Sequence, residues 1–309
     1  MIIDSCDMNL SRSLEEEKEH GTKEFPVAAY WEHHACIPED DIPWHWHREF
    51  ELISVPRGRM EIQVPDDQVN LYGQNLYLIN SNILHFCRAR EEAVLASFVF
   101  SGELLSGEEK SVFARRYILP LTRCRGFKGI LIDGTDRPDL ICDFENAMEA
   151  MKTEGFGYEF KVRELLSHFL LYAAELFRDD FDRAGESEND DDIRIHLLLK
   201  FIDQHYSEPI GLRDIAAAAG ISGRECQRLF QRMIRTSPVQ YLMKYRIEKG
   251  AGMLTEGRAA IADIASRCGI DSPSNFSYLF RRYYYCTPQE YRKRNKAVIS
   301  GTRQNEQRH

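Results

Sequence analysis

One short segment of the chain places side chains suited to reading DNA bases along one side of a helix. Ser222 followed by Glu225 is a helix-capping pattern, so a helix is expected to begin directly after Ser222. At helical spacing one face is apolar, and the opposite face consists of Arg224, Gln227, Arg228 and Gln231. Arginine pairs with guanine in the major groove, and glutamine pairs with adenine. The alternative is an ordinary solvated helix face, which this stripe alone does not exclude.

A second segment further along the chain has a similar layout. Ser272 is suited to cap a helix, with Pro273 at its first position. The expected core face consists of Phe276, Leu279, Phe280 and Tyr283. The expected outward side chains are Ser274, Asn275, Ser277, Tyr278, Arg281 and Arg282. Asn275 is suited to adenine, and the two arginines are placed for phosphates, which set the register of a protein on DNA.

The elements that must position these two stripes form a repeat. Residues 214–222 (DIAAAAGIS) match residues 263–271 (DIASRCGID), and each copy leads into one polar helix. A helix, a glycine-containing turn and a second capped helix are the parts of a helix-turn-helix, which therefore occurs twice. Residues 238–254 are expected to form one connecting helix. If this helix is rigid, the two reading helices can enter successive major grooves about 34 Å apart.

An ordered series of residues in the C-terminal part matches the pattern of a known family. The matching residues are Ile215, Ala216, Gly220, Ile221, Ser222, Phe230, Ser237, Pro238, Tyr241, Leu242, Arg246, Ile264, Ala265, Gly269, Asn275, Phe276, Phe280, Thr287, Pro288, Tyr291 and Arg292. Residues 193–296 thus resemble the DNA-binding domain of the AraC/XylS family of bacterial transcription regulators. The resemblance implies that six side chains contact bases, namely Arg224, Gln227, Arg228, Ser274, Asn275 and Tyr278.

The chain departs from this family pattern at a few positions. Arg235 and Tyr285 stand where the family usually has glycine in a left-handed helix cap. Gly250 replaces an alanine in the connecting helix, and Gly252 follows nearby. Each glycine costs about 1 kcal/mol in helix propensity.

Charge is distributed unevenly along the chain. The whole protein carries a formal net charge of −9. Residues 193–309 hold 20 Lys and Arg against 10 Asp and Glu, a net charge of +10, so residues 1–192 carry −19. A basic unit suits a polyanion. The charge distribution therefore supports double-stranded DNA as the partner of the C-terminal part.

The N-terminal part changes from strand-like to helix-like periodicity near residue 101. Apolar segments with a period near two predict a small antiparallel barrel, at residues 50–55, 60–64, 68–72, 76–79 and 94–100. Two stripes at helical spacing follow, from Leu140 to Met151 and from Val162 to Leu176. The second stripe is wide enough to pack on the barrel and also to meet a partner subunit.

These patterns predict an α+β protein, a cupin-like antiparallel β-barrel with dimerisation helices followed by an all-α domain of two helix-turn-helix units joined by a long helix. The expected segments are a polar arm (1–24), the ligand-sensing barrel (25–101), a helical dimerisation region (102–178), an acidic linker (179–192), the DNA-binding domain (193–296) and a C-terminal tail (297–309).

Histidine and carboxylate side chains recur in the expected barrel. The residues His45, Trp46, His47, Glu51 and Gly58 resemble the first cupin motif, and residues 73–85 resemble the second, with Asn80 and Asn82 where Pro and Gly are usual. Metal-binding cupins hold iron, manganese, nickel or zinc with such residues. The resemblance implies the ligand set His45, His47, Glu51 and His85, whose imidazole and carboxylate groups suit these ions.

The alternative to a metal site is a polar pocket for a small molecule such as a sugar. The expected walls are Trp44, Trp46, Glu51, Glu61, His85 and Phe86, and His45 and His47 are further ligand-binding residues. The two tryptophans flank His45 and should point away from it. His33 and His34 are adjacent, cannot share a strand face and are expected not to take part.

Together these features predict a ligand-responsive transcription factor and not an enzyme. By the family resemblance it would bind promoter half-sites as a homodimer, recruit RNA polymerase and act as an activator. No cofactor is required, although the barrel could take a divalent metal. Two alternatives remain, a metal-dependent cupin enzyme (an isomerase or dioxygenase) and a metal-sensing regulator. An enzyme has no use for two outward polar stripes on repeated helix-turn-helix units.

Composition argues against several classes of protein. No run of 18 apolar residues is present, so a membrane span and a membrane partner are not expected. The first residues include acids where a signal peptide has basic residues. The 8 cysteines contain no C-x-x-C pair, so neither a disulfide framework nor a zinc knuckle is expected. The expected location is the cytoplasm.

Overall fold

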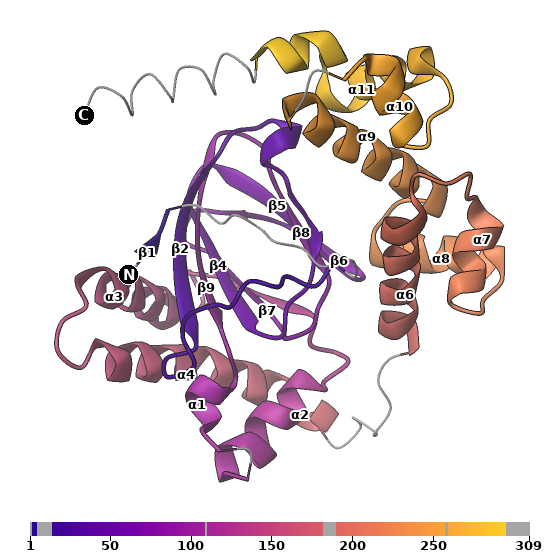
Figure 1. Ribbon diagram of the computed structural model, residues 1–309. Coiled ribbons are helices and arrows are strands. Elements are labelled where there is room, and N and C mark those ends of the chain that lie inside the picture. The colour runs from indigo at the N-terminus through magenta and orange to yellow at the C-terminus, as the bar shows by residue number, and fades with distance from the viewer. Residues whose placement is uncertain (1, 5–13, 109, 182–189, 257–258, 295–309) are drawn as a thin grey trace, which may run out of the picture. The chain divides into compact units, whose positions relative to one another are not determined.

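The chain folds into two compact units, which divide after Ile193. The computed structural model describes residues 2–4, 14–108, 110–181, 190–256 and 259–294. The N-terminal unit combines two β-sheets with helices, and the described residues of the C-terminal unit form helices joined by turns (Figure 1). The predicted α+β organisation is confirmed. The predicted tail (297–309) and residues 182–189 of the predicted linker lie outside the described residues.

Two sheets face each other in the N-terminal unit. Their strands are β1 (Ile2–Ile3), β2 (Val27–His34), β3 (Ile42–His45), β4 (Phe50–Arg57), β5 (Arg59–Val64), β6 (Asp67–Tyr72), β7 (Leu76–Ile79), β8 (His85–Ala89), β9 (Ala93–Phe100) and β10 (Gly129–Ile132). The larger sheet has the order β1-β2-β9-β4-β7-β10, and the smaller sheet has the order β3-β8-β5-β6. All neighbouring strands are antiparallel except β1 and β2, which are parallel.

Alternation along the strands gives the larger sheet two different faces. On β4, Ile53 joins the apolar core between the two sheets, together with Met60 and Ile62 of the smaller sheet. Leu52, one residue earlier, joins the core on the opposite face, which includes Phe169 of a covering helix. The barrel interior and the helix-covered outer face are therefore separate environments.

The helices of the N-terminal unit follow the strands. They are the 3-10 turn η1 (Pro38–Asp40), α1 (Glu103–Ser106), the π-turn η2 (Ala114–Ile118), α2 (Leu119–Thr122), α3 (Pro138–Thr153), α4 (Tyr158–Leu176) and α5 (Arg178–Phe181). Helices α3 and α4 pack on each other, and their apolar faces join the outer core. No helix among the described residues is both long and apolar enough to cross a lipid bilayer.

Two segments of this unit differ from the sequence-based expectation. The strand β10 pairs with β7, although it lies in the predicted helical region 102–178. Its four residues are too short to show a periodicity. Part of the predicted polar arm is packed on the barrel, because Leu14, Glu16 and His20 are buried. The sequence around these residues is rich in charged side chains and has no apolar periodicity, so their burial was not predicted.

The C-terminal unit contains the predicted repeat. Its helices are α6 (Asp190–His205), α7 (Leu212–Ala218), α8 (Gly223–Met233), α9 (Pro238–Glu256), α10 (Ile261–Arg267) and α11 (Pro273–Tyr284), and a further helix spans residues 288–294. The turns between α7 and α8 and between α10 and α11 contain Gly220 and Gly269, which have φ values of +63° and +73°. These left-handed conformations favour glycine, as the repeat requires.

The departures from the family pattern have structural consequences. Arg235 and Tyr285 adopt φ values of +55° and +56°, so non-glycine residues occupy the left-handed position after each reading helix. At Gly250 a β-carbon would lie 2.7 Å from the ring of Phe276, which is fully buried. The absence of a side chain at Gly250 therefore lets α11 approach α9 closely. At Gly252 a β-carbon would have no heavy atom within 4 Å, so this glycine plays no such role.

We expect Gly250→Ala and Gly252→Ala to have opposite effects on stability. Gly252→Ala should raise the free energy of unfolding by about 0.5–1 kcal/mol, because it restores helix propensity in open space. Gly250→Ala should lower it by about 1–3 kcal/mol, because the new methyl group overlaps a packed ring. Urea unfolding of the full chain measures both, and a change of the same sign would contradict the packing role of Gly250.

Candidate functional site

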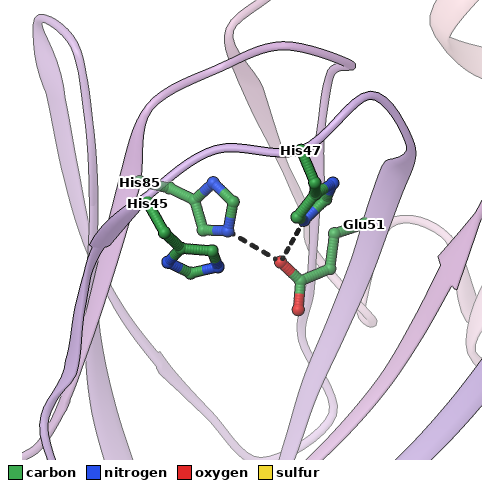
Figure 2. A group of neighbouring side chains, drawn as sticks. All are labelled: His45, His47, Glu51 and His85. Atoms are coloured by element: carbon green, nitrogen blue, oxygen red, sulfur yellow. Dashed lines mark ion pairs between the residues drawn. The ribbon is translucent and has the colours of Figure 1, made fainter. Parts of the chain in front are cut away.

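Four buried polar side chains meet inside the barrel (Figure 2). His45 ends β3, His47 lies two residues beyond it, Glu51 is the second residue of β4, and His85 begins β8. One donor atom from each residue lies within 4.8 Å of all the others. His45 and His85 are directly opposite each other in the β3–β8 pairing, and Glu51 comes from the larger sheet. The cluster therefore joins the two sheets.

The backbone fixes the direction of each imidazole ring. The Nδ1 atom of His45 lies 2.8 Å from the carbonyl oxygen of Pro43, and Nδ1 of His85 lies 2.8 Å from that of Ile83. The Nδ1 atom of His47 lies 3.1 Å from the carbonyl oxygen of Glu49. Because a carbonyl oxygen only accepts hydrogen bonds, each Nδ1 carries the proton. In the neutral rings the lone pair is therefore on Nε2.

These lone pairs meet a carboxylate and no hydrogen-bond donor. The Oε2 atom of Glu51 lies 3.1 Å from Nε2 of His85 and 3.6 Å from Nε2 of His47. Both Nε2 atoms are buried and have no hydrogen-bond partner among the described residues. In the neutral rings, two lone pairs facing a carboxylate repel it, and either a proton on Nε2 or a bound cation removes this repulsion. The cluster thus has the electronic arrangement of a metal ligand set, in which the other ring nitrogen is held by a carbonyl oxygen.

Burial and neighbouring groups shift the pKa values of two members of the cluster. Burial, followed by the neighbouring rings of His85 and His47, lowers the pKa of His45 well below its usual value, so this ring is neutral near pH 7. Burial on its own raises the pKa of Glu51, but the imidazole rings of His47 and His85 beside its carboxylate outweigh it and lower the pKa well below its usual value. A neutral imidazole and an ionised carboxylate are the forms that bind metals.

The donor set and the space beside it fit a metal ion better than a sugar. Three imidazole nitrogens and one carboxylate oxygen suit zinc, iron, manganese or nickel. The cavity next to the cluster has a volume of about 60 Å³. Pockets for organic ligands usually measure about 300–1,000 Å³, whereas one water molecule occupies about 30 Å³ in the liquid. The cavity beside the histidines therefore has room for an ion and water but is smaller than the usual site for an organic ligand such as a sugar.

Several polar residues of this cavity were not predicted from the sequence. Glu16, His20 and Tyr30 line it, as does His34, which was expected not to take part. The Nδ1 atom of His20 lies 2.8 Å from the hydroxyl of Tyr30, and its Nε2 lies 3.4 Å from Oε2 of Glu16. The alternation of side chains along β2 could have indicated that Tyr30 and His34 face the same side, because positions two residues apart share a strand face.

The segment that carries Glu16 and His20 is held against the barrel by backbone hydrogen bonds. The amide of Trp46 donates to the carbonyl oxygen of Leu14 at 3.0 Å, and the amide of Glu16 donates to that of Trp46 at 2.9 Å. Burial, the largest single influence, raises the pKa of Glu16, but His20 and His47 together outweigh it and lower the pKa overall. This segment therefore adds a second carboxylate to the cavity beside the four-residue cluster.

The other expected wall residues lie away from this cavity. Glu61 is buried, but its carboxylate accepts hydrogen bonds from Gln63 and Arg90. Its neighbours Met60 and Ile62 point into the barrel core, so alternation turns Glu61 to the opposite face. Trp44 packs against Phe86 with a ring separation of 5.7 Å. Neither Glu61 nor these aromatic rings line the cavity beside the histidines.

The two asparagines of the second motif have separate roles. The amide of Asn80 donates to the carbonyl oxygens of Leu121 and Phe127 at 3.0 and 2.9 Å, and so holds the loop before β10. Asn82 has a φ value of +62°, the left-handed conformation for which glycine is usual. Asparagine tolerates this conformation better than most residues, so the turn that leads to His85 is kept.

The first reading helix has the amphipathic arrangement expected from the sequence. The hydroxyl of Ser222 accepts a hydrogen bond from the amide of Glu225 at 3.2 Å, and the carboxylate of Glu225 accepts one from the amide of Ser222 at 2.9 Å. The buried face consists of Cys226, Leu229, Phe230 and Met233. The four polar residues of the opposite face, Arg224, Gln227, Arg228 and Gln231, are exposed.

The second reading helix is also oriented as expected, with one difference in its core face. Ser274, Asn275, Tyr278, Arg281 and Arg282 are exposed, and Tyr278 is 67% exposed. Phe276 and Phe280 are buried, but Tyr284 joins them in the core, whereas Leu279 and Tyr283 are only partly buried. Tyr284 stacks on Phe280 at 4.6 Å and meets Tyr291 at 5.1 Å. Because Tyr284 packs against Tyr291 of the last helix, the buried face of α11 lies one residue further round this helix than the sequence indicated.

Comparison with known proteins assigns both units to one family. Residues 32–170 match the AraC-like ligand binding domain, and residues 215–294 match a helix-turn-helix domain. The HTH-type transcriptional activator RhaS of Klebsiella pneumoniae is 30% identical over 274 residues, which cover 85% of this chain and 92% of that protein. The chain belongs to the AraC family of transcriptional regulators. It is therefore a ligand-binding, DNA-binding regulator of transcription.

A second relative agrees with this assignment over nearly the whole chain. The uncharacterized HTH-type transcriptional regulator YdeC of Bacillus subtilis is 26% identical over 297 residues, or 93% of this chain and 98% of that protein. Among solved structures, ToxT from Vibrio cholerae O395 is similar over 86% of this chain and 96% of that one, with 12% identity and a TM-score of 0.42. The family assignment itself rests on the matches of the two domains and on RhaS.

The histidine cluster leads to a prediction about metal content. Protein purified without an affinity tag and loaded with Zn²⁺ should retain about one ion per chain after desalting, because the four donors complete a ligand set. His47→Ala should reduce this to less than about 0.1 ion per chain. His34→Ala is the matched control, because His34 lines the same cavity outside the ligand set. Equal retention by the two variants, measured by mass spectrometry of the metal, would contradict the site.

Proposed function

We propose that this regulator is a metal-responsive activator, in which a divalent ion held by His45, His47, Glu51 and His85 controls binding to promoter DNA. The observation that carries the proposal is the buried convergence of donor atoms within 4.8 Å, with two Nε2 atoms that lack a hydrogen-bond partner. The bound ion would supply the positive charge that the cluster lacks. A metal-dependent enzyme is the second candidate. The only observation that favours it is the cavity of about 60 Å³ beside the four ligands.

The DNA side of the proposal rests on the two exposed polar stripes. Arg224, Gln227 and Arg228 would read bases from α8, and Asn275 would do so from α11. Arg281 and Arg282 would contact phosphates. The RhaS relative is named an activator. On this basis we propose that this chain acts in the cytoplasm and recruits RNA polymerase.

The proposal also includes a homodimer formed through α4. Most of the predicted stripe on this helix is buried within its own unit, and Leu166 is fully buried. Phe160 and Leu171 are instead 78% and 51% exposed. Their spacing of eleven residues is close to three helical turns, so both lie on one outward face. This exposed apolar face would be covered in a dimer of two such helices.

Arg228 provides a test of base reading. On a site selected from random DNA, Arg228→Ala should weaken binding by about 1–3 kcal/mol, and it should change binding to unrelated DNA little. Arg228→Lys is the matched control, because it keeps the charge but loses the paired hydrogen bonds to guanine. Fluorescence anisotropy on both DNAs measures the effects. Equal losses on selected and unrelated DNA would show that Arg228 contacts only phosphate.

Coupling between the ion and DNA provides a test of metal response. The affinity for the selected site should differ about 5–150-fold between Zn²⁺-loaded and chelator-treated protein, which is the usual range for allosteric coupling. Glu51→Gln should bind DNA equally well in both conditions, because it removes the ligand that bridges the two sheets. If the wild-type affinity does not change with the ion while Zn²⁺ stays bound, the ion has no regulatory role.

A further inference from the structure

A second and larger cavity lies in the N-terminal unit, on the other side of the larger sheet from the histidine cluster. It has a volume of about 690 Å³ and lies between α3 and the outer face of the sheet. We call it the α3 cavity. Its apolar wall includes Trp31 of β2 and Phe144 and Met148 of α3, and its rim includes Glu145, Glu149 and Lys152. This volume falls within the usual range for sites that bind organic molecules.

Residue spacing explains how the α3 cavity forms. Phe144 and Met148 are four residues apart on α3 and face the sheet, where both are buried. Glu145 and Glu149 are each one residue further round, so they are exposed at the edge. On β2, Trp31 shares the outer face with Ala29, which belongs to the core beneath the helices. Trp31 is nevertheless 38% exposed, so its ring is only partly covered by the protein.

The charges around the α3 cavity favour a cation. Asp4, Glu145 and Glu149 contribute three carboxylates to its lining, against the single ammonium group of Lys152. Residues 1–192 as a whole carry a net charge of −19, which strengthens this potential. The face of an indole ring attracts cations as well as apolar groups. An anionic ligand would meet repulsion at the same rim.

We propose that the α3 cavity binds an organic cation with a bulky aromatic or branched apolar body. The apolar part would lie against Trp31, Phe144 and Met148, and the positive charge would lie near Glu145 and Glu149. The site goes beyond the function proposed above, because neither the metal cluster nor the DNA-binding unit contributes a residue to it. It gives the regulator a place for an organic effector that the cavity of about 60 Å³ beside the histidines is too small to hold.

Two probes of the same shape and opposite charge test the proposal with the full chain. Tetraphenylphosphonium should bind at about one molecule per chain and at least about tenfold more tightly than tetraphenylborate in calorimetry. The double variant Glu145→Gln/Glu149→Gln should weaken phosphonium binding about tenfold, because it removes two negative charges. Lys152→Gln is the matched control. It removes a positive charge from the rim and should therefore strengthen phosphonium binding about threefold. Equal binding of the two probes, or rim variants without effect, would overturn the proposal.

Tryptophan fluorescence locates the bound probe. Of the 3 tryptophans, Trp31 lines the α3 cavity, so phosphonium should quench wild-type emission and lose this effect in Trp31→Phe. Retention of the quenching in this variant would place the probe elsewhere and overturn the proposal.

The same variants separate this inference from the proposed function. Zn²⁺ retention and DNA affinity should be unchanged in Glu145→Gln/Glu149→Gln, because both side chains are exposed and neither belongs to the cluster or to the DNA-binding unit. If phosphonium does not bind while DNA and Zn²⁺ do, only the α3 cavity proposal fails. If phosphonium binds as expected but Zn²⁺ does not alter DNA affinity, only the metal response fails.

Discussion

The proposed metal response depends on one buried contact, in which the Nε2 atoms of neutral imidazole rings face the carboxylate of Glu51 and repel it. Backbone carbonyl oxygens fix the Nδ1 atoms of three histidines, and this turns the Nε2 lone pairs toward one another and toward the carboxylate of Glu51. Burial excludes most of the water that would reduce the repulsion. A divalent cation at this point would make attractive contacts with all four groups, which is the physical basis of the proposed metal response.

The position of the cluster suggests how occupancy could be transmitted within its unit. His45 and His85 belong to the smaller sheet and Glu51 to the larger one, so an ion bound by all three fixes the distance between the sheets. Strand β4 carries Glu51 on its inner face, and Ser54 of the same strand lines the α3 cavity on its outer face. One strand therefore contacts both proposed ligand sites. In this proposal, a ligand at either site would act by favouring one arrangement of this strand and the helices that cover it.

Those parts of the structure that depend on local patterns could be predicted from the sequence. The capping pair Ser222 and Glu225 located α8, and the repeat located the second helix-turn-helix. The spacing of His45, His47 and Glu51, read through the cupin resemblance, identified the side chains that the structure brings together with His85. The burial of Glu16 and His20 could not be predicted, because pairing with Trp46 is a long-range contact within a charged segment. The sequence showed only that Gly250 has a low helix propensity. Its role in packing could not be predicted, because it depends on the close approach of Phe276.

X-ray absorption spectroscopy of the Zn²⁺-loaded full chain tests the central claim most directly, because it measures the atoms around the ion. The account predicts a first shell of nitrogen and oxygen at about 2.0–2.2 Å. The outer-shell scattering should correspond to three imidazole rings, and Glu51→Gln should alter the shell without removing that imidazole signal. A first shell dominated by water oxygen or by cysteine sulfur, with imidazole scattering from fewer than two rings, would contradict the claim that the histidine cluster is a metal site.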